Sequence, residues 1–160
     1  MSGDYYLKID GFDGESTDDK HKGEIDVQSW SWGETQSGTS ASGGGGGAGK
    51  VSMQDFNFVM QTNKASPKLM LACANGQHIK TAKLTCRKAG GEQQEYMTIE
   101  FSDLLISSYQ TGGSTGDVLP MDAISFNFGK IQFEYKPQKS DGTLDSPVKT
   151  GYDLKANKKV

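Results

Sequence analysis

The stretch EIDVQSWSW, residues 24–32, alternates like a β-strand, but the alternation changes phase partway along. Ile25 and Val27 fall on one face of an extended chain, whereas both tryptophans fall on the other, because strand side chains alternate with a period of two. One extra residue swaps the faces of a strand, so we predict a bulge near Gln28-Ser29. Bulges bend and twist strands, as a curled or closed sheet requires.

Similar strand patterns recur along the chain, separated by turns rich in Gly, Asp and Ser. A second change of face, at Gly129, predicts another bulge. We therefore predict a mainly β fold, a single domain over residues 1–160 built as one β-barrel of two curled, mostly antiparallel sheets. The expected strands cover residues 5–9, 24–32, 51–60, 82–87, 96–101, 104–109, 124–135 and 148–154.

One short α-helix is expected at about residues 67–75, on the flank of the barrel. Ser66 is a favourable N-cap, Pro67 suits the first helical position, and Asn75-Gly76 is a stop. A helix this short is held by packing rather than by propensity. The side expected to face the core consists of Leu69, Met70, Ala72 and Cys73.

Residues 33–50 consist mainly of Ser, Gly, Thr and Ala, and we expect a long loop there. Loops longer than about 12–15 residues are usually functional or disordered. The spacing of Gly44, Gly49 and Lys50 matches a phosphate-binding loop, but Val51 stands where that motif needs Ser or Thr, and no helix is expected to follow. We interpret the segment as a surface loop.

The composition excludes several classes of protein. The 160 residues carry 17 basic and 20 acidic side chains, a net charge of −3, whereas nucleic-acid binding needs a basic stripe against the phosphates. The sequence has no apolar run long enough to cross a membrane. Its first residues lack an apolar segment, so no cleavable secretory signal is expected.

Few residues are suited to metal binding or catalysis. Cys73, Cys86, His21 and His78 are too few for a zinc site of the usual spacing, so no metal or cofactor is expected. We interpret both cysteines as buried free thiols, with a disulfide as the alternative. His21 lies in the charged run at residues 18–22, which is expected to be solvated, and no nucleophile is evidently paired with it. We therefore expect no catalytic residue and favour a binding or structural role.

An ordered set of short motifs covers almost the whole chain, and with it the sequence resembles the haemolysin-coregulated protein (Hcp) family, the tube protein of bacterial type VI secretion systems. No single motif is specific, but the order and spacing of the set are. The set includes Lys8-Ile9-Asp10-Gly11, Glu24-Ile25-Asp26-Val27, Trp30-Ser31-Trp32-Gly33, Ser66-Pro67-Lys68-Leu69-Met70, Gly76-Gln77-His78, Arg87-Lys88-Ala89-Gly90-Gly91 and Tyr135-Lys136-Pro137-Gln138.

The resemblance implies a structural subunit. Six protomers would form a hexameric ring, and stacked rings would form a tube inside a contractile sheath and beneath a spike. The partners would be further copies of the chain, sheath and spike proteins, and small secreted effectors held in the central hole, with no nucleic acid and no membrane insertion. The protein would be made in the bacterial cytoplasm and, on firing, secreted to the extracellular space without a cleavable signal peptide.

Two groups of residues are expected to carry this role. In the family, a long loop like residues 33–50 projects towards the neighbouring subunit or ring. Ser29 and Ser31 project from the face opposite the tryptophan rings, and we expect them to line the hole and contact cargo. The expected ring and stacking contact consists of Gly43, Gly44, Gly45, Gly46, Gly47 and Lys50.

Three other interpretations are kept open. The chain is compatible with a phage-type tail tube subunit, which the genes around it would reveal. It is compatible with a ligand-binding β-sandwich that stacks its ligand on Trp30 and Trp32, which predicts a monomer or dimer. It is also compatible with a small hydrolase that uses His21 or His78.

Overall fold

The computed structural model describes residues 3–38, 50–89 and 93–160. Each strand pairing in this part of the chain is antiparallel. The elements, in order, are β1 (Asp4–Ile9), β2 (Ile25–Val27), β3 (Ser29–Ser31), β4 (Glu34–Gln36), β5 (Val51–Met53), β6 (Phe56–Gln61), α1 (Ser66–Asn75), β7 (His78–Arg87), β8 (Glu95–Gly112), β9 (Met121–Tyr135), β10 (Val148–Asp153) and β11 (Lys158–Lys159).

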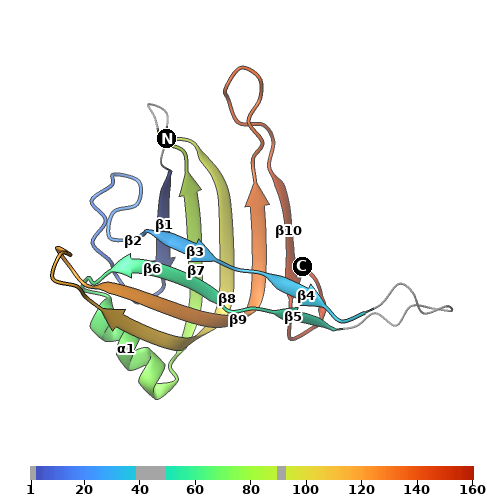
Figure 1. The fold of residues 1–160 in the computed structure, drawn as a ribbon. Coiled ribbons are helices and arrows are strands. Elements are labelled where there is room, and N and C mark those ends of the chain that lie inside the picture. The colour runs from blue at the N-terminus through green and yellow to red at the C-terminus, as the bar shows by residue number, and fades with distance from the viewer. Residues whose placement is uncertain (1–2, 39–49, 90–92) are drawn as a thin grey trace.

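Nine of these strands form one sheet that curls into two layers (Figure 1). The strand order is β11-β10-β9-β8-β7-β1-β2, and β6 joins β9 to β3. The first half of β9 pairs with β6 and its second half pairs with β10, so β9 belongs to both layers. The predicted mainly β fold of curled antiparallel sheets with one short flanking helix is confirmed. The curl stops short of a closed barrel, because among the described strands no pairing joins β2 to β6.

The predicted change of phase lies at Gln28, which separates β2 from β3. Its backbone N–H donates to the carbonyl of Val59 on β6 at 2.8 Å, while β2 pairs with β1. Ile25 is fully buried before the break, and after it the ring of Trp30 stacks on Phe56 with 6.0 Å between centroids. The extra residue therefore lets both halves of the segment face the same core.

The bulge predicted at Gly129 is wrong. The register between β8 and β9 is constant across Gly129, and it shifts instead between Ile106 and Ser108. The face of β9 does change at Gly129, but β8 changes face beside it, where Asp103 adopts a φ of 58°. Two paired strands that turn over together need no extra residue, and a single sequence does not show which strand lies alongside.

The helix begins differently from the prediction. Its N-cap is Ala65, not Ser66, and the Ser66 hydroxyl donates instead to the carboxylate of the buried Asp122 at 2.5 Å. Gly76 ends the helix in the left-handed conformation, with φ of 66°, as predicted. Leu69 and Ala72 are buried, but Met70, which was expected inside, is half exposed.

The long loop expected at residues 33–50 is shorter than predicted. Residues of β4 pair with β5, Thr35 opposite Ser52, and the two strands form a ribbon that projects from the body as an arm (Figure 1). The side chains of β4 are polar and exposed, so backbone pairing holds this strand without the buried face that a pattern search detects. Residues 43–47, the glycine run of the predicted contact, lie outside the described residues.

The core is centred on phenylalanine rings that both layers contribute. Phe56 of β6 lies 4.9 Å from Phe101 of β8 and 5.1 Å from Phe126 of β9, measured between ring centroids. Phe101 and Phe126 meet edge to face at 5.0 Å. Such pairs add to the stabilisation that burial of the rings already provides. This cluster is where the two layers are held together.

We expect the substitution Phe56→Ala to destabilise the protein by about 3–5 kcal/mol, because it removes a ring from the centre of this cluster and leaves a cavity. The matched substitution Leu71→Ala, at an exposed position of α1, should cost less than about 1 kcal/mol. Urea unfolding at one fixed protein concentration measures both. Equal losses would contradict the role assigned to the cluster.

Candidate functional site

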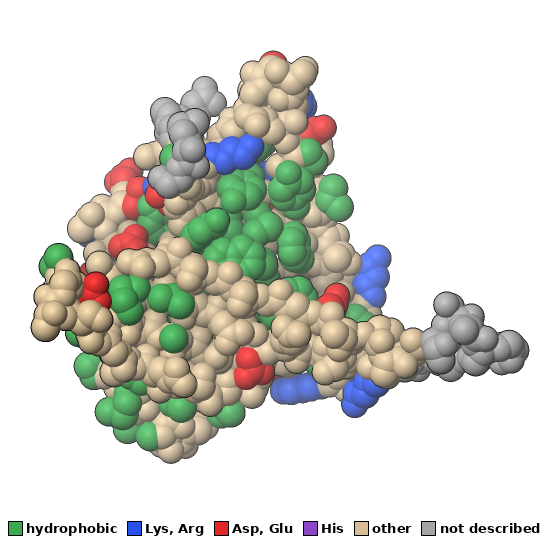
Figure 2. All heavy atoms as spheres, viewed as in Figure 1, with side chains coloured by type: hydrophobic (Ala, Val, Ile, Leu, Met, Phe, Trp, Pro, Cys, Tyr) green, Lys and Arg blue, Asp and Glu red, His purple; other side chains and the backbone are tan. Residues whose placement is uncertain are grey.

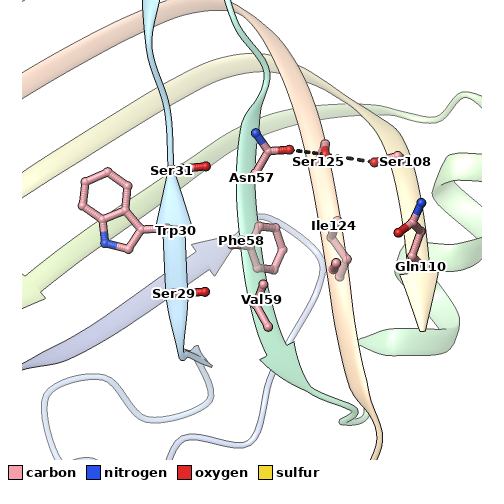
Figure 3. Close-up of a pocket in the computed structure, with 11 residues that line it drawn as sticks. Ser29, Trp30, Ser31, Asn57, Phe58, Val59, Ser108, Gln110, Ile124 and Ser125 are labelled. Carbon is pink, nitrogen blue, oxygen red and sulfur yellow. Dashed lines mark hydrogen bonds between the residues drawn. The ribbon is translucent and has the colours of Figure 1, made fainter. Parts of the chain in front are cut away.

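We call the layer formed by β3, β6, the first half of β9 and the second half of β8 the front layer. A shallow pocket of about 380 Å³ lies on its outer side, across these four strands (Figure 3). The pocket results from the alternation of side chains along the strands. On β6, Phe56, Phe58 and Met60 are buried, so Asn57 between Phe56 and Phe58 points outward. We call this surface the hydroxyl–amide face. Its polar side chains belong to Ser29, Ser31, Asn57, Ser108, Gln110 and Ser125.

Strand register places four of these side chains in one row. Ser31 lies opposite Asn57, Asn57 opposite Ser125, and Ser125 opposite Ser108. The Ser108 hydroxyl donates to Ser125 Oγ at 2.9 Å, and the Ser125 hydroxyl donates to Asn57 Oδ1 at 2.5 Å (Figure 3). The row therefore forms a chain of hydrogen bonds across three strands, and it fixes the direction in which the side-chain groups point.

Ser29 and Ser31 lie together on this face, both exposed, as the sequence predicts. Trp30 between them points to the opposite side of β3, against Phe56 and Tyr5 (Figure 3). Lys50 is exposed beside the start of β5. Sequence reasoning missed Asn57 and Ser125, although alternation in Phe56-Asn57-Phe58 and in Ile124-Ser125-Phe126 was enough to place them outward.

The chemistry of the hydroxyl–amide face is that of hydrogen bonding without charge. None of the described residues that line the pocket is acidic, basic, a histidine or a cysteine. Hydroxyls and amides both donate and accept, so the face can contact many polar surfaces. It offers none of the titratable groups that general acid–base catalysis uses.

The geometry does not support the interpretation of the chain as a hydrolase that uses His21 or His78. His21 is buried, with 7% of its surface exposed, and its ring stacks on Tyr6 at 4.4 Å between centroids. Its Nδ1 lies 2.9 Å from Glu24 Oε2 and its Nε2 lies 2.6 Å from Glu95 Oε1, so carboxylates occupy both ring nitrogens. His78 is exposed and lies 3.1 Å from Asp103. Among the described residues, neither histidine forms a hydrogen bond with a hydroxyl or thiol group.

The expectation that the run at residues 18–22 is solvated holds for Asp19, Lys20 and Lys22, which are exposed. It is wrong for His21, which is buried, and for Asp18, which Arg87 binds from inside. The Arg87 side chain is 2% exposed, and its two terminal nitrogens donate to the Asp18 carboxylate at 2.9 and 2.8 Å. It also donates to Tyr6 Oη at 2.7 Å and to Asp4 at 3.1 Å. A buried guanidinium with this bidentate partner fixes the loop after β1 to the end of β7.

Asp122 is a second buried anchor. It accepts hydrogen bonds from Thr62 Oγ1 at 2.8 Å, Ser66 Oγ at 2.5 Å and Tyr109 Oη at 3.0 Å. Burial alone raises the pKa of this carboxyl, but the hydrogen bonds, with that of Ser66 foremost, hold its pKa below the usual range. Asp122 therefore joins the ends of β6, α1 and β8 at the edge of the hydroxyl–amide face.

Both cysteines are free thiols, as predicted. Cys86 is fully buried, and burial raises the pKa of its thiol to about 12. Cys73 is only partly buried. In the described ranges no group of three or more His, Cys, Asp or Glu residues could hold a metal ion, and none of the helices is long and apolar enough to cross a membrane.

A curled sheet with a rigid core and one outer face of hydroxyls and amides is suited to a structural or binding protein. The family described as type VI secretion system effector, Hcp, matches residues 6–135. Protein hcp1 of Pseudomonas aeruginosa is 52% identical over 159 residues, which is 98% of each chain. The solved structure of a type six secretion system protein superposes with a TM-score of 0.93 at 34% sequence identity, over 99% of this chain and 100% of that one. The solved structure of Hcp1 from Salmonella typhimurium has a TM-score of 0.81 and 36% sequence identity, and the match covers 100% of both chains. The chain therefore belongs to the Hcp family of the type VI secretion system.

We expect Asp18→Asn to lower stability at pH 7, because it leaves the buried Arg87 without its bidentate carboxylate. Hydrogen bonding to Arg87 lowers the pKa of Asp18 from 3.8 to about 2. The folded state therefore gains stability from the ionised carboxylate above pH 3.8, and this gain disappears as the pH falls towards 2.

The stability difference between wild type and Asp18→Asn should accordingly narrow between pH 4 and pH 2. Thermal unfolding across that range measures it. Asp19→Asn, at the exposed neighbouring position, is the control and should follow the wild type throughout. A difference that stays constant with pH would refute the pairing with Arg87.

Proposed function

We propose that six copies of this chain form a flat ring with a central hole, and that rings stack into the tube which the type VI secretion system exports. Two observations support this: membership of the Hcp family, and a curled sheet whose front layer presents uncharged polar side chains on its outer side. An interface that closes by rotation gives a ring, and a repeated axial contact gives a tube.

In this proposal the hydroxyl–amide face lines the hole and contacts cargo. The observation that carries the assignment is the absence of charge among the described residues of the face, combined with a fixed row of hydroxyls and amides. Uncharged groups bind a protein surface through individually weak hydrogen bonds, because each one replaces a bond to water. Such a surface retains small secreted effectors in the hole without binding them irreversibly.

The remaining partners follow from the same proposal. A contractile sheath would surround the tube, and a spike would cap it. Lys50, exposed at the outer end of the β4–β5 ribbon, and residues 43–47 would contact a neighbouring subunit or ring. The protein would be folded in the bacterial cytoplasm before firing and then leave the cell.

The competing binding-module interpretation is less well supported by the packing. A ligand shelf needs exposed rings, but Trp30 packs between Tyr5 and Phe56, with centroids 6.1 and 6.0 Å away. The relatives reported above favour a secretion tube over a phage-type tail tube.

Purified protein should form six-fold rings in negative-stain electron microscopy, with a mass by light scattering near six times 17.3 kDa. Measurement across salt and protein concentration separates weak assembly from none. A uniform monomer or dimer under all conditions would contradict the ring.

Ser31→Trp should keep the rings and lose cargo, because a large ring at this position fills the pocket and breaks into the row of hydroxyls and amides. Ser31→Thr keeps the hydroxyl and is the matched control. The measurement compares, by mass spectrometry, the small proteins that remain bound to purified rings from the same producing bacterium. Loss of the rings themselves in Ser31→Trp would place Ser31 in a subunit contact instead.

A further inference from the structure

A second hollow, of about 580 Å³, lies beneath the arm. We call it the arm groove. It is formed between the β4–β5 ribbon and the paired strands β9 and β10, and large apolar side chains line it although it is open. The side chains that matter here are Trp32, Val51, Met53, Phe133 and Tyr152. Open apolar surfaces of this kind are typical of contact sites.

The apolar surface continues beyond the arm groove along the same face of β9 and β10. Tyr135 lies two residues beyond Phe133, and Val148 is its partner on β10; both are exposed. The Nε1 atom of Trp32 is buried and has no hydrogen-bond partner among the described residues. A buried donor without an acceptor is costly to the folded chain.

An exposed apolar projection lies at the other end of the front layer. In the turn between β8 and β9, Val118 is 93% exposed and Leu119 is 45% exposed. We call this pair the apolar knob. The turn is fixed at both sides, because the Asp117 N–H donates to Ser114 O and the Thr62 N–H donates to Pro120 O, both at 2.9 Å. Little entropy would be lost when the knob binds.

The surroundings of the apolar knob and of the arm groove differ in charge. Beside the apolar knob stands Asp117, and Leu119 shares a small pocket with Glu15 and Asp26. On the face shown in Figure 2, acidic side chains gather near β2 and basic ones flank the arm. The segments that bound the arm groove carry four exposed lysines, Lys50, Lys149, Lys158 and Lys159, against three carboxylates, Glu34, Glu134 and Asp153. Of these groups, Lys159 and Glu34 line the groove itself.

Helix α1 offers a competing apolar surface, since Met70 and Leu71 are 50% and 56% exposed. Its exposed surroundings include Lys64, Lys68 and Lys80. A basic helix would be repelled by the lysines that flank the arm groove, whereas the acidic turn at residues 113–120 would be attracted. Charge therefore selects the apolar knob over the helix as the segment that fits.

We propose that the apolar knob of one copy inserts into the arm groove of the next copy, with Asp117 facing the lysines of β11. The inference rests on the proposed ring and names its lateral contact. The turn between β8 and β9 and the β4–β5 arm lie at opposite sides of the molecule (Figure 1). The contact is therefore head to tail, and each copy has one knob and one arm groove to offer.

Cysteine trapping tests the contact directly. Leu119→Cys and Met53→Cys are combined in a chain that also carries Cys73→Ser, and the protein is oxidised. A disulfide forms only where the two Cα atoms come within about 7 Å. We expect a ladder of covalent multimers up to six copies on a non-reducing gel, which collapses to the monomer on reduction. Each single variant should give no ladder.

Met70→Cys with Met53→Cys is the matched control and tests the helix as the occupant. A ladder from this pair, or wild-type rings with no ladder from Leu119→Cys and Met53→Cys, would overturn the proposed contact while leaving the ring intact. Absence of rings in the unmodified protein would instead refute the proposed function first, and this contact with it.

Charge reversal gives an independent readout. Asp117→Lys should raise the protein concentration needed for rings at least tenfold, and adding Lys158→Glu and Lys159→Glu should restore assembly. Lys68→Glu on the exposed side of α1 is the control and should leave assembly unchanged. Circular dichroism confirms that each variant folds. Rings that form equally well in Asp117→Lys would contradict the assigned polarity.

Discussion

Two long strands, β8 and β9, belong to both layers of the sheet, and the rest of the structure depends on that shared membership. Both strands turn over at one place, beside Asp103 and Gly129, without any shift of register. β9 then exchanges β6 for β10 as its partner. A sheet that curls in this way surrounds its own core, and rings from both layers pack between them.

The same constraint explains why the hydroxyl–amide face is polar and ordered. Side chains at alternate positions of the front layer are committed to the core, so their neighbours must face outward. There a row of serines and one asparagine crosses three strands at fixed spacing. The two ends of that layer differ from its middle: one end is acidic with an apolar projection, and the other is basic with an apolar hollow. Surface chemistry thus changes along the layer while the backbone scaffold stays regular.

The sequence was sufficient for features that depend on near neighbours. The phase change at Gln28, the helix end at Gly76 and the outward direction of Ser29 and Ser31 follow from local alternation and turn chemistry. It was insufficient where a distant partner decides the outcome. Alternation along the strand sets Arg87 on the face opposite Leu84 and Cys86, and only the fold brings Asp18, 69 residues earlier, to pair with it.

Long-range partners also explain the other differences. Ser66 has the chemistry of an N-cap, but a buried carboxylate 56 residues later takes its hydroxyl. β4 has no apolar face, so its pairing with β5 left no pattern to detect. In both cases a partner distant in the sequence, and not the local pattern, decided the outcome.

The state of the two thiols has a consequence for the export proposed for this protein. Cys86 is held as an uncharged thiol inside the core, and the reactive form in oxidation is the thiolate, so its burial and raised pKa make it slow to oxidise. No covalent cross-link has to form for the chain to fold. Cys86 therefore keeps the same covalent structure in reducing and in oxidising surroundings, and the proposed export does not depend on forming a disulfide inside the core.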